Sequence, residues 1–146
     1  MPMIDIHVPS DALDETERAR LADELATLLL EAEGAPDTDL FRGITWVYLH
    51  DSAPLLGGRG MRQPRFRIEV TVPEGALSPS RKQRFLEAAQ AAVTTVAGLD
   101  ERQALHVWTL IREVPEGSWG AGGQAVRYEQ LRSLAESERG KPNPAE

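Results

Sequence analysis

The sequence predicts an α+β fold in which duplicated β-α-β units form a four-stranded mixed sheet with two helices on one face. One observation behind this prediction is an internal repeat. The segment IDIHVP at 4–9 recurs as IEVTVP at 68–73, a shift of 64 positions. A later match, between 44–51 and 106–113, has a shift of 62 positions, so one connection is two residues shorter. Two copies are too few for a solenoid, so we interpret the chain as a duplicated unit that pairs with itself.

The second observation is that each copy begins and ends with a strand pattern. Residues 3–8 and 66–72 alternate apolar and polar side chains, which is the period-2 pattern of a strand. The second strands, at 44–50 and 106–112, are rich in aromatic and branched residues. A strand–helix–strand unit of this length implies parallel pairing through a right-handed crossover. The sheet face opposite the helices is expected to stay apolar and to need a partner, which predicts oligomerisation.

The third observation is a helix pattern between the two strands of each copy. Apolar residues recur there at helical spacing, namely Leu21, Leu25, Leu28 and Leu29 in the first copy and Phe85, Ala89, Ala92, Val93 and Val96 in the second. Asp14 with Glu17 resembles a capping box, and Ser78 before a proline is a good N-cap. Gly34 and Gly98 stand where a helix ends in a left-handed residue.

The chain length and these elements predict a single domain over residues 1–135. A Gly/Pro-rich linker separates the two repeats, a short helix is expected near the end, and the last residues are expected to be disordered. The expected parts are the repeats 2–51 and 66–123, the linker 52–65, a helix within 126–135 and a tail at 136–146.

The composition excludes several classes of function. A formal charge of −7 argues against a nucleic-acid surface, which needs a basic face. The absence of cysteine excludes disulfides, thiolate catalysis and cysteine-ligated metals. The histidines His7, His50 and His106 are too scattered for a zinc pattern, so no metal is expected. The sequence shows neither a signal peptide nor a membrane span. We therefore expect a cytoplasmic protein that binds neither nucleic acid nor membrane.

Pro2 is the residue with the most chemical potential. A small second residue favours removal of Met1, which would leave Pro2 as a free secondary amine. An α-amino group titrates near ~8, and an apolar wall lowers that pKa because it disfavours the charged form. Such an amine can move protons to and from carbon at neutral pH.

Pro2 at the start of a duplicated β-α-β unit resembles the tautomerase superfamily, whose type member is 4-oxalocrotonate tautomerase. The segment EVPEGSWGAGG at 113–123 is similar to the family's aromatic residue before a glycine-rich turn. The resemblance covers roughly residues 2–123, and the doubled length is similar to the cis-3-chloroacrylic acid dehalogenase group. It implies the tautomerase fold, a homotrimer, and a cofactor-independent enzyme with Pro2 as its catalytic amine.

The resemblance also implies roles for side chains in the second repeat. The family's pocket aromatic matches Trp119, and a second pocket position falls on Trp108. The acidic residue that activates water in the dehalogenases matches Glu113. Two of these residues have an alternative interpretation. Trp108, like its counterpart Trp46, could fill the core or a contact between subunits of the trimer. Glu113 could be a solvent-exposed residue at the end of its strand.

The group that binds the substrate anion is left open. The family's carboxylate-binding arginines fall on Pro73 and Ala76, neither of which carries a charge. Backbone N–H groups around 73–75, or Arg112, are the alternative donors to a developing oxyanion. In the second repeat Phe66 replaces Pro2, so only one of the two equivalent positions has the amine.

These observations predict a cofactor-independent tautomerase or isomerase that acts on a small enol or keto acid, with Pro2 as general base. The alternatives are a hydratase-, dehalogenase- or decarboxylase-like lyase on the same scaffold, and a catalytically silent trimeric binding protein.

Overall fold

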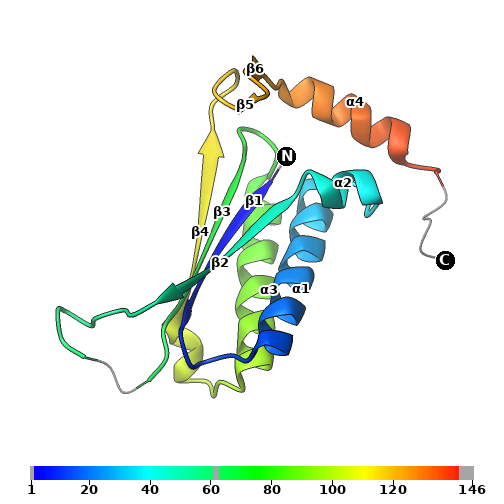
Figure 1. Cartoon of the computed structure of the whole chain (residues 1–146). Helices are drawn as coiled ribbons and strands as arrows, with labels where there is room; N and C mark the ends of the chain where they lie inside the picture. Colours follow the sequence, from blue (N-terminus) through cyan, green and yellow to red (C-terminus); the bar gives the residue numbers. More distant parts are fainter. Residues whose placement is uncertain (1, 61–62, 142–146) are drawn as a thin grey trace.

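The computed structural model describes residues 2–60 and 63–141 and shows one sheet with two long helices on one of its faces (Figure 1). The sheet strands run in the order β2-β1-β3-β4, and a separate two-stranded hairpin follows them. The strands are β1 (Met3–Pro9), β2 (Trp46–Ser52), β3 (Phe66–Pro73), β4 (Val107–Val114), β5 (Gly120–Ala121) and β6 (Gln124–Ala125). The helices are α1 (Glu15–Glu33), α2 (Asp39–Gly43), α3 (Pro79–Ala97), a 3-10 turn (Gln103–His106) and α4 (Tyr128–Glu138).

The pairing of the strands confirms the predicted duplication. β1 pairs with β2 and β3 pairs with β4 in parallel, whereas the two repeats meet through the antiparallel pair of β1 and β3. The helices α1 and α3 each contain 19 residues and are offset by the same 64 positions as the first strands. The predicted α+β class, with a four-stranded mixed sheet and two helices on one face, is therefore correct.

The core lies between the sheet and the two long helices. On β1 and β3 the predicted apolar face is completely buried, and α1 and α3 contribute leucines, alanines and Phe85 to the same cluster. The fully buried strand residues are Ile4, Ile6, Val8, Ile68, Val70 and Val72. Because strand side chains alternate between faces, a slip of one residue would exchange this set for the polar one.

Local signals in the sequence explain where the long helices begin and end. Asp14 Oδ1 accepts a hydrogen bond from the Glu17 backbone N–H (2.8 Å), and Glu17 Oε2 accepts one from the Asp14 N–H (2.9 Å), which completes the predicted capping box. Ser78 caps α3 in a similar way. Gly34 ends α1 with φ +69°, a left-handed conformation that glycine adopts without steric cost.

Strand β2 starts two residues later than expected. The segment before it forms the short helix α2, whose N-cap is Thr38 and whose last residue is Gly43. The Thr45 hydroxyl then donates to the Phe41 carbonyl oxygen (2.7 Å), so residues 44 and 45 complete the exit from this helix. Apolar periodicity alone does not distinguish such a helical exit from the first residues of a strand.

The C-terminal helix α4 extends to Glu138, three residues beyond the boundary that we expected at 135. It packs on the end of α1 and on α2, where Ala135 contacts Leu30 and Phe41 in a small second cluster. The Arg139 guanidinium donates to the Gly34 carbonyl oxygen (2.7 Å). The expected disordered tail is thus helical over 136–138, and residues 142–146 lie outside the described part of the chain.

The sheet face opposite the helices is less apolar than we expected. It exposes Trp46, Tyr48 and Trp108, but polar pairs lie among them. His50 contacts Asp5 (2.6 Å), and the His7 and His50 rings stack with their centroids 4.5 Å apart. Alternating strand positions that face away from the core therefore carry aromatic and charged side chains together.

We expect core and surface leucines to differ sharply in their contribution to stability. Leu29→Ala removes a fully buried side chain of α1 and should lower the free energy of unfolding by about 2–5 kcal/mol. Leu40→Ala is the matched control, because Leu40 on α2 is 41% exposed and its loss should cost less than about 1 kcal/mol. Urea denaturation at one protein concentration measures both values. Equal losses would contradict this description of the core.

Candidate active site

Pro2 lies buried immediately before β1, at the end of the sheet where β3 finishes. Its carbonyl oxygen accepts a hydrogen bond from the Trp46 backbone N–H (3.2 Å). The next residue, Met3, lies between Trp46 on β2 and Thr71 on β3. Continued by one residue, this antiparallel register places Pro2 level with Val72. The hydrogen bond to Trp46 and the pairing of Met3 on both sides fix the position of Pro2.

A cavity of about 670 Å³ opens beside Pro2. Its walls are mainly apolar and come from β1, the α2–β2 connection, β3 and the segment that follows β4. The side chains that define it best are Pro2, Ile44, Trp46, Val114 and Trp119. The structure thus places Trp119 at the same cavity as Pro2, with Trp46 as a second aromatic wall.

A tight hairpin holds Trp119 at this cavity. β5 pairs antiparallel with β6, and the two residues between them, Gly122 and Gly123, have φ angles of +57° and +77°. A two-residue turn with positive φ at both positions matches the twist of a hairpin and strongly favours glycine. The Trp119 carbonyl oxygen accepts from the Val126 N–H (2.8 Å), which closes the base of the hairpin. The glycine-rich signal in the sequence therefore has a structural cause.

Trp108 lies in a different place from Pro2 within one chain. It is 70% exposed and lines a separate cavity of about 400 Å³ with His7, Phe66, Arg67 and His106. That cavity is at the end of the sheet where β3 begins, which is the opposite end from Pro2. Arg65 also lines it. The expected pairing of Trp108 with Trp119 in one pocket does not occur within a single chain.

Glu113 and Arg112 are both engaged in ion pairs at the end of β4. Glu113 accepts from the Lys82 ammonium group (2.8 Å). This hydrogen bond, together with one from the Gly75 backbone, lowers the pKa of Glu113 below its ordinary value. Arg112, on the opposite face, pairs with Glu69 (2.5 Å). Neither side chain lines the cavity beside Pro2.

The two positions that match the family's arginines also differ in their surroundings. Pro73 lines a third cavity, described below, whereas Ala76 is buried in the core. The backbone donors near them already have acceptors: the Glu74 N–H donates to Val114 O (2.9 Å) and the Ala76 N–H donates to Pro73 O (3.1 Å). The Gly75 backbone lies close enough to Glu113 to help lower the pKa of that carboxyl group. The Glu74 N–H, one of the expected oxyanion donors around 73–75, is thus occupied within the chain.

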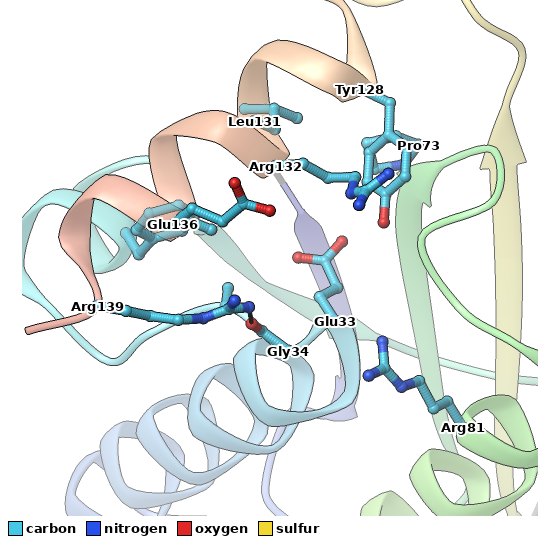
Figure 2. A pocket seen from close by; sticks show the side chains of 12 residues that line it. Glu33, Gly34, Pro73, Arg81, Tyr128, Leu131, Arg132, Glu136 and Arg139 are labelled. Carbon is cyan, nitrogen blue, oxygen red and sulfur yellow. Dashed lines mark hydrogen bonds between the residues drawn. The ribbon is translucent and has the colours of Figure 1, made fainter.

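The sequence analysis missed a polar cavity of about 260 Å³ between the ends of α1 and α3 and the helix α4. Figure 2 shows the Glu33 carboxyl group pointing into it, with Arg81 on one side and Arg132 above. Burial raises the pKa of Glu33 to about 7. Comparison of the repeats does carry a signal, since Ala97 stands where Glu33 would recur. The approach of Arg132 depends on how α4 docks, which no local pattern indicates.

Two further observations concern the described residues. Over residues 2–60 and 63–141, no group of three or more histidine, aspartate or glutamate side chains is arranged to hold a metal ion. No helix in this part of the chain is long and apolar enough to cross a membrane.

Sequence comparison places the second repeat in a known family. Residues 67–128 match the model of a family described as tautomerase enzyme. This range runs from β3 through α3 and β4 to the start of α4, so it contains Trp108, Glu113 and Trp119 but not Pro2. No curated protein gives a significant sequence match to the chain.

Solved structures resemble the chain over nearly its whole length. N1, a member of the cis-3-chloroacrylic acid dehalogenase family, has a TM-score of 0.71 and 23% identity, with 92% of this chain and 96% of N1 covered. Pt0534, in a crystal structure of the protein inactivated by 2-oxo-3-pentynoate, has a TM-score of 0.71 and 17% identity, with 88% and 98% covered.

Fused 4-OT, solved as an asymmetric trimer, has a TM-score of 0.70 and 19% identity, with 90% of this chain and 98% of that chain covered. At these identities the likeness shows a shared fold. Residues 67–128 thus match the tautomerase family model, within a chain that has the same fold as N1 and fused 4-OT.

Proposed function

We propose that the protein is a cofactor-independent tautomerase that acts on a small enol or keto acid, with Pro2 as general base. The proposal includes removal of Met1, because only a terminal proline has a basic nitrogen. The observation that carries it is the position of Pro2, buried at the start of β1 and facing a largely apolar cavity with Trp119.

The surroundings of Pro2 favour a neutral amine at working pH. Ile44, Val114 and the aromatic rings of Trp46 and Trp119 surround the cavity, so the charged form of a terminal amine there would lose hydration. A general base works best when its pKa lies near the working pH. The ring also limits the motion of the nitrogen, since β1 is hydrogen-bonded on both sides.

The reaction then needs only one proton carrier. Neutral Pro2 takes a proton from the enol oxygen of the substrate, or from a carbon next to its carbonyl group, and the electron pair of the broken O–H or C–H bond is delocalised over the resulting enolate. The protonated amine then returns that proton to a carbon at a different position of the conjugated system. Bonds and charge balance without a redox partner, and the apolar walls keep water from competing for the enolate.

We also propose that the chain assembles as a homotrimer. The exposed sheet face carries large aromatic side chains, with Trp46 61% and Trp108 70% exposed. A face of this kind marks an interaction surface more often than a solvated one. The fused 4-OT structures, which share the fold, are trimers. In such an assembly Trp108 would serve as a contact between subunits.

The rival lyase mechanism needs Glu113 to activate a water molecule. The geometry of one chain gives this mechanism less support, because Glu113 is paired with Lys82 and does not line the cavity of Pro2. Its lowered pKa reflects that ion pair and not an exposed catalytic base. We therefore assign Glu113 a structural role between β4 and α3.

We expect Pro2→Ala to reduce kcat by roughly two to four orders of magnitude, because a positioned acid–base group contributes about that much. Alanine keeps a primary amine that is more mobile, so a residual rate should remain. The assay uses phenylenolpyruvate and 2-hydroxymuconate with protein whose intact mass shows that Met1 is absent. Full activity of the variant on a substrate that the wild type converts would contradict the proposal.

We expect Trp119→Ala and Trp108→Ala to affect different properties. Trp119→Ala should raise KM about tenfold or more, because burial of an aromatic side chain against substrate is worth roughly 1.5–3 kcal/mol. Trp108→Ala should leave KM nearly unchanged and should weaken the trimer, measured by light scattering on dilution. The assignment fails if Trp108→Ala raises KM as much as Trp119→Ala does.

The ion pair between Glu113 and Lys82 should make stability depend on pH. The lowered pKa means that this pair stabilises the fold above the ordinary glutamate pKa and loses its contribution as the pH falls through the lowered value. Lys82→Met should therefore raise the pKa of Glu113 toward the ordinary value, as followed by NMR of the carboxyl carbon. Lys141→Met is the control, because Lys141 pairs with Glu138 instead. An unchanged Glu113 pKa in Lys82→Met would show that the pair does not form.

A further inference from the structure

We propose that the polar cavity bounded by α1, α3 and α4 is a binding site for a small carboxylate anion, held by the guanidinium groups of Arg81 and Arg132 with the Glu33 carboxyl group as a hydrogen-bond donor. The inference does not depend on the chemistry of Pro2. Glu33, Arg81 and Arg132 are not positions that match the family's arginines, although one such position, Pro73, lines the cavity.

The central observation is an unsatisfied carboxyl group. Glu33 is the last residue of α1, and its Oε1 is buried without a hydrogen-bond partner among the described residues. A buried polar atom without a partner is costly. Figure 2 shows the Glu33 carboxyl group directed into the cavity and not toward the helix end. The cavity is therefore built around a group that lacks its hydrogen bond.

Two arginines approach the same space from different helices. Arg81, in the first turn of α3, packs so close to the end of α1 that a Cβ atom at Gly34 would lie 3.4 Å from its Nη2. Arg132 reaches the cavity from α4. Over the described residues, neither guanidinium forms an ion pair with a carboxylate within 4.0 Å. Both have donors available for an anion.

The charges that face Glu33 favour an anion over a cation. Arg81 comes from α3, and α4 contributes Arg132, Arg139, Glu136 and the neutral Tyr128. The charge of the amino terminus also acts on Glu33 and lowers its pKa, against the larger effect of burial. Arg139 already donates to the Gly34 carbonyl oxygen, but its charge remains. Burial raises the pKa of Glu33 to about 7, so below neutral pH this carboxyl group is protonated and donates a hydrogen bond. Three arginines then face one carboxylate, that of Glu136.

The size of the cavity limits the ligand. Its volume is about 260 Å³. Since a water molecule takes about 30 Å³ of liquid, the cavity can hold an acid of a few carbon atoms but not a peptide or a nucleotide. Planar carboxylates suit guanidinium groups, which can donate two parallel hydrogen bonds.

The internal repeat gives a control within the molecule. At the other end of the sheet the 64-residue shift places Ala97 where Glu33 stands, and Glu17 where Arg81 stands. Both polar groups are therefore specific to the end of the sheet that carries Pro2. Pro73, which lines the cavity, follows Val72, the residue beside Pro2 in the sheet register. The site is thus next to the candidate active site without sharing its side chains.

Isothermal titration calorimetry with pyruvate tests this site, with pyruvamide as the neutral analogue. We expect pyruvate to bind to both the wild type and Pro2→Ala, at least fivefold more tightly at pH 6.0 than at pH 8.5. The pH dependence follows because ionised Glu33 repels the anion and cannot donate. The described lining residues include no histidine. The amino terminus, whose charge acts on Glu33, also titrates in this range, so the pH dependence is assigned to Glu33 by comparison with Glu33→Gln. Pyruvamide should bind at neither pH.

Variants separate the site from a general charge effect. Arg81→Gln and Arg132→Gln should each weaken pyruvate binding at pH 6.0 at least tenfold. Arg84→Gln, an exposed arginine on the same helix as Arg81, is the matched control and should leave binding unchanged. Glu33→Gln keeps a donor without a charge, so it should retain binding and abolish the pH dependence. Thermal melting identifies any variant that fails to fold.

The proposal is overturned if pyruvate does not bind to the wild type, or if pyruvamide binds equally well. It is also overturned if folded Arg81→Gln and Arg132→Gln bind like Arg84→Gln, or if Glu33→Gln keeps the full pH dependence. None of these measurements uses enzymatic activity. Turnover of Pro2→Ala tests the proposed function, and pyruvate binding tests this site, so either proposal can fail without the other.

Discussion

The antiparallel contact between β1 and β3 determines the position of almost every other element. Both strands contribute an unbroken row of fully buried side chains, with Ile6 opposite Ile68 and Ile4 opposite Val70. Burial of each such side chain contributes roughly 1.5–3 kcal/mol, and a one-residue slip would expose the whole row. The contact therefore joins the two repeats in a single register. That register places Pro2 level with Val72, at the end of the sheet from which the chain continues through β5 and β6 into α4 (Figure 1).

The same contact explains why the two ends of the molecule have diverged. Because β1 and β3 are antiparallel, the two ends of the sheet are equivalent. At one end β1 begins and β3 finishes, and at the other end β3 begins and β1 finishes. One end has Pro2 with the polar group Glu33 nearby, and the other has Phe66 with Ala97. Duplication conserved the core positions, because both repeats must bury the same face. Side chains outside the core differ between the two ends, as Pro2 and Phe66 do.

Much of the fold was predictable because it depends on local patterns. Alternating strands, helical spacing and the caps at Asp14, Gly34 and Gly98 each specify their own element without knowledge of the rest. The aromatic residue before the glycine-rich turn pointed to Trp119, since the turn chemistry is itself local. The shift of β2 was missed because a short helix ending at Gly43 has no periodicity of its own.

The other features that were missed depend on contacts between distant segments. No pattern shows that α4 packs on α1, so the approach of Arg132 to Glu33 was invisible, as was the ion pair of Glu113 with Lys82. The separation of Trp108 from Pro2 follows from strand direction, because parallel pairing with β3 carries the start of β4 to the opposite end. A family position can therefore be matched in sequence and still lie far from the site within one chain.

The proposed chemistry requires the Pro2 nitrogen to be a basic amine whose surroundings lower its pKa. Nitrogen NMR of protein labelled at proline with ¹⁵N measures this directly, because an amine titrates and a peptide nitrogen does not. We expect one proline signal to titrate, with a pKa below that of an amino-terminal proline in a short unstructured peptide. The absence of any titrating proline signal, or a pKa equal to that of the peptide, would contradict the account.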